Sequence, residues 1–198
     1  MSHHIYQTEG FIAGSFPQGE ANRLIYVFSE DLGLVRAVAQ SVRALHSKLR
    51  HSLQDFSFSK ISFVRGKDVW RIVGAEKLEL LERSMKDASK KEMVAKISVI
   101  LKRFVRGEEK DAEFFADLRG GFQFLDREEF SSEEMSLFEL LFVLRAMKHL
   151  GYWLPVENDE LYGAGNYTEW SKENLKLARG KEQKITAIIN RGFSHSHL

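Results

Sequence analysis

The sequence predicts an α+β protein, with a small β-barrel over residues 1–80 followed by an all-helical domain over residues 81–198. Two observations carry this prediction. Before residue 80, short apolar segments with alternating side chains are separated by turns that contain glycine or proline. After residue 82, apolar residues recur at helical spacing instead. With 43% hydrophobic residues in 198, the chain can bury a substantial core.

Five strands are expected in the first domain. They cover residues 5–16, 22–29, 34–40, 55–66 and 68–79. The second and third are joined by a hairpin turn that ends at Gly33, in the left-handed conformation. The fourth carries Phe56 and Phe58 in the opposite phase to Ile61 and Phe63, which indicates a bulge or a sharp bend. Five short strands, one of them bent, favour a five-stranded oligonucleotide/oligosaccharide-binding (OB) barrel, although the strand count alone leaves an SH3-like barrel open.

Five helices are expected in the second domain. They cover residues 89–107, 111–125, 131–151, 166–180 and 181–193. Ser89 with Glu92 and Ser131 with Glu134 have the spacing of capping boxes. The Gly120–Gly121 pair is expected to end the second helix. The third helix is apolar nearly all round, which is typical of the central helix of a bundle.

Composition excludes several classes of function. The chain has no cysteine, so it has no disulfide, thiolate metal site or thiol nucleophile. It also lacks glycine-rich nucleotide loops, the nucleophile elbow and the metalloprotease helix motif. We therefore expect neither an enzyme, nor a cofactor, nor a metal site. Because there is no signal-peptide core and no long uncharged apolar segment, we expect a cytoplasmic protein.

Positive charge is concentrated in one segment. Between Arg36 and Arg71 the chain has eight basic and two acidic residues, a local charge of +6 in a chain whose net charge is +1. The segment includes QSVRALHSKLRHSL, residues 40–53, an expected loop without acidic residues. Such a concentration suits a polyanion-binding surface, although a solvated face would have the same composition. The candidate phosphate contacts in this segment are Arg36, Arg43, Lys48, Arg50, Lys60, Arg65 and Lys67.

Aromatic residues on the strands are candidates for a second kind of contact. OB barrels can stack bases on exposed aromatic rings. The candidates are Phe16, Tyr26, Phe63 and Trp70. Most aromatic residues on strands belong to the core, so only some of these are expected to face solvent.

Residues 8–56 contain a series of short motifs in a fixed order. They are Glu9-Gly10-Phe11, Gly19-Glu20 with Arg23-Leu24, Gly33, Ala39 to Arg43, Ser47-Lys48-Leu49, and Gln54 with Phe56. In order and spacing this series resembles the N-terminus of the RecO family of recombination mediators. LRAMKHLGYWLP, residues 144–155, is similar to a helix end of the same family.

The resemblance implies an OB-fold domain followed by a helical domain. It also implies a role in DNA repair: binding single- and double-stranded DNA, annealing single strands, and loading the recombinase onto DNA coated by single-strand-binding protein. The implied partners are RecR and the acidic C-terminal tail of single-strand-binding protein, at the nucleoid, and annealing needs no cofactor. Arg43, Lys48 and Arg50 match family positions in the basic loop. Arg23 matches as well, or instead forms a salt bridge with Glu20.

The chain departs from the family pattern in two ways. It is shorter than typical members. Many members also carry a four-cysteine zinc site after the helix end, whereas Glu157 to Tyr167 contain no cysteine, so no zinc is expected.

One alternative belongs to another class, a protein-interaction adaptor. In that case the barrel is a scaffold and the helical domain binds a partner's peptide. Arg145 and Lys148 are the candidate contacts for an acidic tail, unless they only extend their stems along a buried helix. If the chain is an adaptor of this kind, Arg43→Glu is expected to have no effect on any interaction with DNA.

Overall fold

The computed structural model describes residues 4–43, 47, 49–67, 69–152 and 169–195. By compactness the chain divides into two units, Met1–Phe115 and Ala116–Leu198. The strands end at Leu78 and the first helical turn begins at Ser84, on either side of residue 80. The unit that contains the barrel therefore extends beyond the strands.

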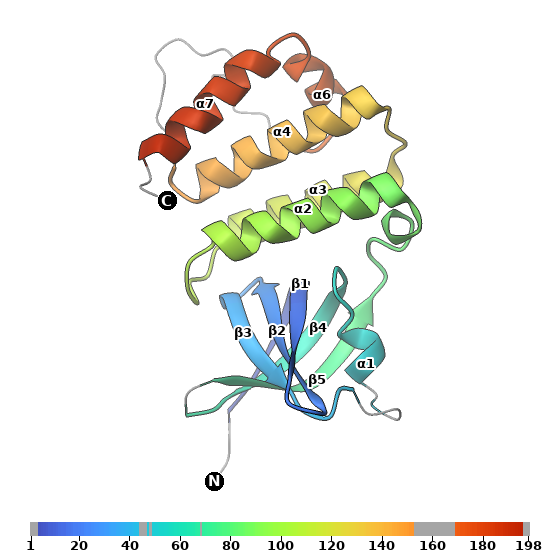
Figure 1. Cartoon of the computed structure of the whole chain (residues 1–198), viewed down its shortest axis with the longest axis vertical. Helices are drawn as coiled ribbons and strands as arrows, with labels where there is room; N and C mark the ends of the chain where they lie inside the picture. The colour runs from blue at the N-terminus through green and yellow to red at the C-terminus, as the bar shows by residue number, and fades with distance from the viewer. Residues whose placement is uncertain (1–3, 44–46, 48, 68, 153–168, 196–198) are drawn as a thin grey trace. The chain divides into compact units, whose positions relative to one another are not determined.

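Five strands form the barrel, close to the predicted positions. They are β1 (Ile5–Gln18), β2 (Asn22–Ser29), β3 (Gly33–Ala39), β4 (Phe58–Arg65) and β5 (Trp70–Leu78). Gly33 has a φ of 64°, as predicted for the turn between β2 and β3. The basic segment that was expected to be a loop contains a short helix, α1 (Leu49–Ser52), beside β5 (Figure 1).

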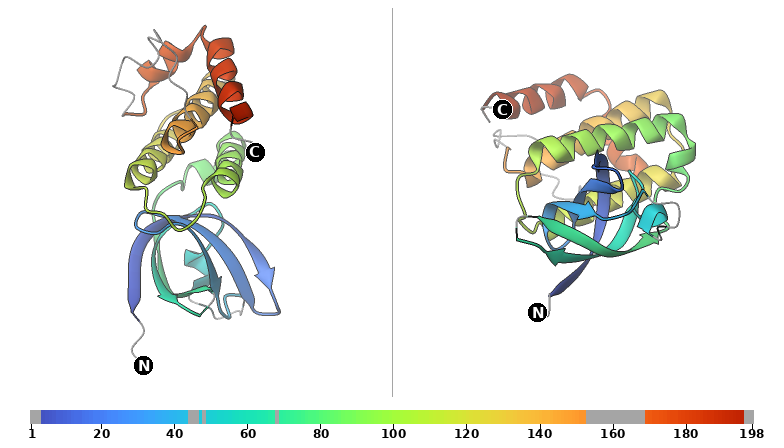
Figure 2. Two further views of the ribbon diagram at one scale, coloured as in Figure 1. Left: turned by 90° about the vertical axis from the view of Figure 1, so that its left-hand side faces the viewer. Right: turned by 60° about the horizontal axis from the view of Figure 1, so that its bottom comes forward.

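The strand order closes the barrel as β1-β2-β3-β5-β4, and β4 pairs back to β1 (Figure 2). All pairs are antiparallel except β3 with β5, which run parallel. A closed five-stranded barrel of this order is the OB fold, so the predicted fold class is confirmed.

The barrel interior is filled by side chains that alternate along each strand. Ile25 and Val27 of β2, and Ile61 and Phe63 of β4, are fully buried there. Phe58 lies on the opposite face of β4 from Ile61, as the odd spacing requires. The predicted phase change is thus real, but it arises because β4 buries both faces. The register irregularity lies further along, between Ser62 and Phe63 in the pairing of β4 with β5.

A second apolar cluster covers the outer face of the barrel. Phe28 of β2 packs against Phe114 and Phe115, with ring centroids 5.2 and 5.9 Å away. Phe58 contacts Phe11 at 5.2 Å. These contacts explain why the compact unit of the barrel continues as far as Phe115.

Helix α2 (Ala88–Phe104) belongs to this unit and lies beside β1. Its N-cap is Asp87, whose side chain accepts a hydrogen bond from the Lys90 backbone N–H. The predicted capping box of Ser89 with Glu92 is therefore wrong. Asp87 lies two residues earlier and caps the helix there, so Ser89 lies within the first turn.

Helix α3 (Ala112–Arg127) passes through the Gly120–Gly121 pair without interruption, so the predicted helix end there is wrong. A Cβ on Gly121 would lie 3.0 Å from the Trp170 ring. The glycines therefore leave room for an indole to pack on the helix, which compensates for their low helix propensity.

The remaining helices are α4 (Ser132–His149), α6 (Lys172–Ala178) and α7 (Glu182–His195). The predicted capping box at the start of α4 is confirmed: Ser131 accepts from the Glu134 backbone N–H, and Glu134 accepts from the Ser131 backbone N–H. Leu137, Phe138, Leu141 and Phe142 of α4 are buried. In the part of the chain that the structure describes, no helix is long and apolar enough to cross a membrane.

Candidate nucleic-acid interface

Three of the predicted DNA-binding residues line one hollow on the barrel, which we call the cationic hollow. It has a volume of about 290 Å³. Arg36 lies on β3, Arg65 ends β4, and Lys67 follows β4 in the turn to β5. Its lining also includes Leu24, Trp70 and Glu108. All three cations are exposed, so they are accessible to a ligand.

Strand pairing explains why these cations converge. The pairing of β3 with β5 places Ala37 opposite Trp70, and the pairing of β4 with β5 places Arg65 opposite the same Trp70. Arg36, the neighbour of Ala37, therefore reaches the region of Arg65 from a strand far away in the sequence. The Arg65 Cζ lies over the indole, 5.1 Å from the ring centroid.

The Trp70 side chain is only 4% exposed. Among the described residues, its Nε1 is the buried side-chain nitrogen or oxygen that has no hydrogen-bond partner. A buried N–H without a partner costs free energy, and such groups call for an explanation when they occur. Here the unsatisfied donor belongs to a residue that lines the cationic hollow.

Among the residues that the structure describes, Glu108 is the acidic residue that lines the hollow. The Glu108 carboxylate is 3.4 Å from the Arg65 guanidinium. Its loop is anchored to the β2–β3 turn, because the Leu34 backbone N–H donates to the Gly107 carbonyl and Lys110 pairs with Asp31 at 2.7 Å. The hydrogen bond and charge of Lys110 lower the pKa of Asp31. Glu108 is thus held at the hollow by a fixed loop, which the sequence reasoning missed.

Arg23 and Arg43, from the family motif, lie elsewhere on the barrel and have partners. The Arg23 guanidinium is 3.7 Å from Asp55, which also accepts a hydrogen bond from the Ser15 hydroxyl. Arg23 therefore forms a salt bridge, as the alternative predicted, but its partner is Asp55 and not Glu20. Arg43 is exposed and donates to the Gly19 carbonyl at 3.2 Å.

The other predicted cations have different surroundings. Arg50 is exposed on α1, and Lys48 lies outside the described residues. Lys60 is exposed on β4, but the strand pairing places Glu9 on one side of it and Glu76 on the other. Two acidic neighbours in the same row make Lys60 a poor phosphate contact.

The structure separates the four aromatic candidates into two pairs. Phe63 and Trp70 are buried in the barrel at 0% and 4% exposure, and so cannot stack on a base. Phe16 is 53% exposed on the outer face, and its ring centroid is 5.9 Å from that of the partly buried Tyr26. The pairing of β1 with β2 places Phe16 opposite Leu24, so this pair adjoins the cationic hollow.

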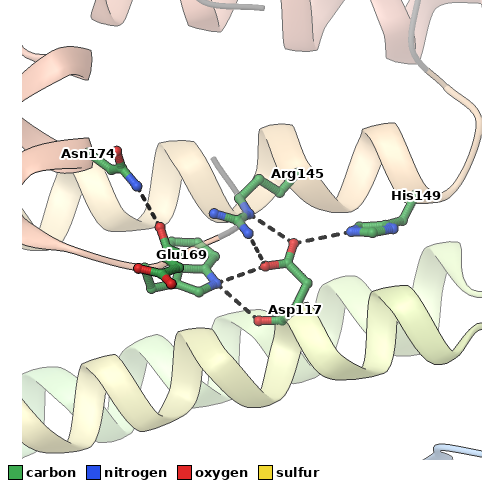
Figure 3. A network of polar contacts seen from close by, with 6 residues as sticks. Asp117, Arg145, His149, Glu169 and Asn174 are labelled. Atoms are coloured by element: carbon green, nitrogen blue, oxygen red, sulfur yellow. Dashed lines mark hydrogen bonds and ion pairs between the residues drawn. The ribbon is translucent and has the colours of Figure 1, made fainter. Parts of the chain in front are cut away.

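In the second unit, Arg145, which the sequence suggested for partner binding, forms a partly buried ion pair with Asp117. The Asp117 carboxylate accepts from Arg145 Nε at 2.8 Å and contacts His149 Nε2 at 3.2 Å (Figure 3). Burial, the largest influence, raises the pKa of Asp117, but hydrogen bonds from His149 and Arg145 and their charges outweigh it. The net effect is a lowered pKa for Asp117.

Trp170 completes this network. Its Nε1 donates to the Asp117 carboxylate at 2.9 Å, and the Arg145 guanidinium lies over its ring at 4.4 Å. Arg145 is therefore fully engaged within its own unit, which disfavours it as the contact for an acidic tail. Lys148 is exposed near the end of α4.

The closed barrel with its appended helices defines this chain as an OB-fold protein with a helical extension. Residues 1–80 match the family model described as recombination protein O, N terminal. The resemblance noted in the sequence is therefore confirmed: the first 80 residues match the RecO N-terminal family model, and the chain is similar to RecO proteins beyond that region.

Several curated relatives carry the name DNA repair protein RecO. The one from Dehalococcoides mccartyi is 34% identical over 76 residues, which are 38% of this chain and 30% of the relative. The one from Clostridium novyi is 24% identical over 153 residues, 77% of this chain and 59% of the relative. The one from a Synechococcus species is 29% identical over 153 residues, 71% of this chain and 52% of the relative. The chain thus matches between 30% and 59% of the length of these relatives.

Proposed function

We propose that this chain is a DNA-binding recombination mediator that acts in DNA repair. In this role it binds and anneals single-stranded DNA and helps to load the recombinase, together with a RecR-like protein and the tail of single-strand-binding protein. No catalysis and no cofactor are involved. The proposal for annealing and for these partners comes from the RecO resemblance, and such a role belongs to the nucleoid in the cytoplasm.

The cationic hollow is the observation that carries the DNA-binding part of the proposal. Arg36, Arg65 and Lys67 lie together on an OB barrel and are open to solvent. Most of the affinity of proteins for nucleic acid comes from cations that neutralise phosphates and release counterions. Three converging cations beside one exposed aromatic residue, Phe16, are an arrangement that suits phosphate and base contacts.

The geometry also ranks the predicted contacts. The hollow comes first, because its three cations share one surface. Arg43 and Arg50 come second, since both are exposed but neither lines the hollow. Lys60 comes last, because Glu9 and Glu76 flank it. We therefore expect the hollow, more than the basic loop, to determine affinity.

The test is fluorescence anisotropy with a labelled 30-mer single strand and its duplex, over a series of salt concentrations. We compare the wild type with three variants: Arg36→Gln/Lys67→Gln, Arg43→Gln/Arg50→Gln, and Lys60→Gln. Arg65 is left intact because it packs on Trp70. For a single strand, each lost phosphate contact reduces the slope of log affinity against log salt by about 0.7.

We expect the hollow variant to lose most of its affinity, the loop variant less, and Lys60→Gln almost none. Equal effects of the two double variants, with about half of that effect for Lys60→Gln, would mean that affinity follows net charge alone and not a site. Failure of the wild type to bind either DNA would overturn the proposal. Annealing is then followed by energy transfer between complementary labelled strands, with and without single-strand-binding protein.

A further inference from the structure

The outer face of β1 and β2 has an exposed aromatic surface beside the hollow. Phe16 and Tyr26 meet edge to face, with ring planes at 75°. Phe16 is the more accessible of the two, with just over half of its surface exposed. An aromatic ring exposed to this extent on a strand buries little area in the fold. Its face is therefore available to a ligand.

A cation from another element lies over the same face. The Lys102 ammonium, from α2, is 3.2 Å from the position that a Cβ on Gly14 would occupy. Gly14 pairs with Tyr26 across β1 and β2, and Tyr26 pairs with Arg36 across β2 and β3. The row that crosses these three strands thus has Lys102 at one end and Arg36 at the other.

The absence of a side chain at Gly14 lets the ammonium lie close to the strand. A Cβ there would be in tight contact with the ammonium, which would have to shift slightly. Lys102 is only partly exposed, and it forms no ion pair with a carboxylate among the described residues. Its charge is therefore available to an anion on the barrel face.

Helix α2 contributes more charge than the barrel segment alone suggests. Residues 88–106 contain six basic residues and one acidic residue. This helix belongs to the same compact unit as the barrel. The basic residues of the unit therefore come from two stretches of sequence, and Lys102 of the second stretch lies close to β1.

We propose that Phe16, Tyr26 and Lys102 form a contact site for unpaired nucleotides, in which a base stacks on Phe16 and a phosphate binds Lys102. The inference rests on the proposed function, because it assigns a selectivity to the same DNA-binding surface. Stacking needs the open face of a base, which a single strand offers and a duplex hides in its base-pair stack. This site therefore favours single strands, while the cations of the hollow accept either kind of DNA.

The first test compares two substitutions on β1. Phe16→Ala removes the exposed ring, and Ile5→Ala is the matched control, since Ile5 is 55% exposed on the same strand and Phe16 is 53% exposed. Loss of one stacked base weakens binding by about five- to hundredfold. We expect this loss for the single-stranded 30-mer with Phe16→Ala, no change for the duplex, and no change with Ile5→Ala.

The second test addresses the phosphate contact. Lys102→Gln should reduce the salt slope for single-stranded DNA by about 0.7. Lys91→Gln is the control, because Lys91 is exposed on α2, three turns from Lys102, and the change in charge is the same. Phe16→Trp keeps a stacking surface, so it should keep the affinity and show quenching of indole fluorescence on binding the oligonucleotide.

The outcomes separate the inference from the proposed function. If the wild type binds neither DNA, both are overturned. If it binds DNA but Phe16→Ala has no effect, or weakens single-stranded and duplex binding equally, only the inference is overturned. Melting temperatures of all variants show whether a loss of binding reflects a loss of folding. If Phe16→Ala is unstable, quenching of the indole fluorescence of Phe16→Trp by the oligonucleotide tests the stacking instead.

Discussion

The Arg65 guanidinium and the Glu108 carboxylate are 3.4 Å apart at the edge of the cationic hollow. Both side chains are well exposed, so the pair contributes little to stability. Its significance lies in competition, because a phosphate that approaches Arg65 must displace a carboxylate that is already there. The hollow thus contains an internal competitor for its ligand.

We predict that Glu108→Gln strengthens DNA binding by about two- to fivefold at low salt, the range that a surface ion pair of up to about 1 kcal/mol allows. Anisotropy titrations at 50 mM salt measure the change. Glu109→Gln is the control, with the same charge change in the same loop at a residue that does not line the hollow. An equal gain in both variants would mean that only net charge matters.

Gly33 and Gly19 have nearly the same backbone conformation but different surroundings. Their φ angles are 64° and 66°, a conformation that costs a non-glycine residue about 1 kcal/mol or more. A Cβ on Gly33 would lie 2.2 Å from the Glu109 carbonyl oxygen, whereas a Cβ on Gly19 would meet nothing within 4 Å. We expect Gly19→Ala to lower the free energy of unfolding by about 1 kcal/mol and Gly33→Ala by at least twice that amount. Urea denaturation measures both, and similar losses would show that the contact with the 105–110 loop is unimportant.

The largely buried side chains of Asp117 and Arg145 predict a large effect of this ion pair on stability. The Asp117 side chain is 9% exposed, so Asp117→Asn leaves the Arg145 charge without its counterion. We expect a loss of about 3–5 kcal/mol. The double variant Asp117→Asn/Arg145→Gln should lose clearly less than the sum of the two single variants, since the pair is coupled. If the losses of unfolding free energy of the two single variants, measured by urea denaturation, add up to the loss of the double variant, the two side chains do not interact.

The same pair has a defined pH dependence. Because the pKa of Asp117 is lowered in the folded state, its contribution to stability is fully present above its ordinary value of 3.8. The contribution disappears as the pH falls through the lowered folded pKa. The stability difference between the wild type and Asp117→Asn should therefore narrow only below pH 3.8. A difference that narrows already at neutral pH would assign the effect to another group.

Glu134 provides a direct titration at the start of α4. The Ser131 backbone N–H, followed by Lys172, lowers the pKa of Glu134 to about 2. Its charged form is stabilised at all pH values above the ordinary 4.5, and this stabilisation is lost between 4.5 and 2. We expect Lys172→Gln to raise the pKa of Glu134 only part of the way, since the backbone donor remains. Carboxyl chemical shifts measure it, with Lys176→Gln on the same helix as the control.

Local sequence signals predicted the elements but not every contact between them. β2 was placed correctly at 22–29 because its apolar residues are bounded by turns on both sides. Ser131 with Glu134 was recognised because a capping box is completed within four residues. Gly120 and Gly121 gave the wrong helix end, since their partner Trp170 lies some 50 residues away in the chain. The low helix propensity of glycine can be recognised from the local sequence, whereas the packing that compensates for it cannot.

The candidate interface was predicted in the same partial way. Arg36, Arg65 and Lys67 were found from the charge of one segment, but their convergence depends on the parallel pairing of β3 with β5. Glu108 and Lys102 were missed because they reach the barrel from beyond the last strand. The sequence feature that could have indicated Lys102 is the concentration of basic residues in 88–106, together with the glycine at position 14.

The cluster of Phe28 with Phe114 and Phe115 bears on where the chain can be cut. A fragment ending at residue 80 keeps all five strands and the whole family match. It removes the two phenylalanines that cover Phe28, and with them α2. The outer aromatic rings of the barrel then face water, a surface that promotes aggregation. A fragment that keeps these rings covered must therefore include α3, which positions both phenylalanines, and so it extends well beyond the residues of the family match.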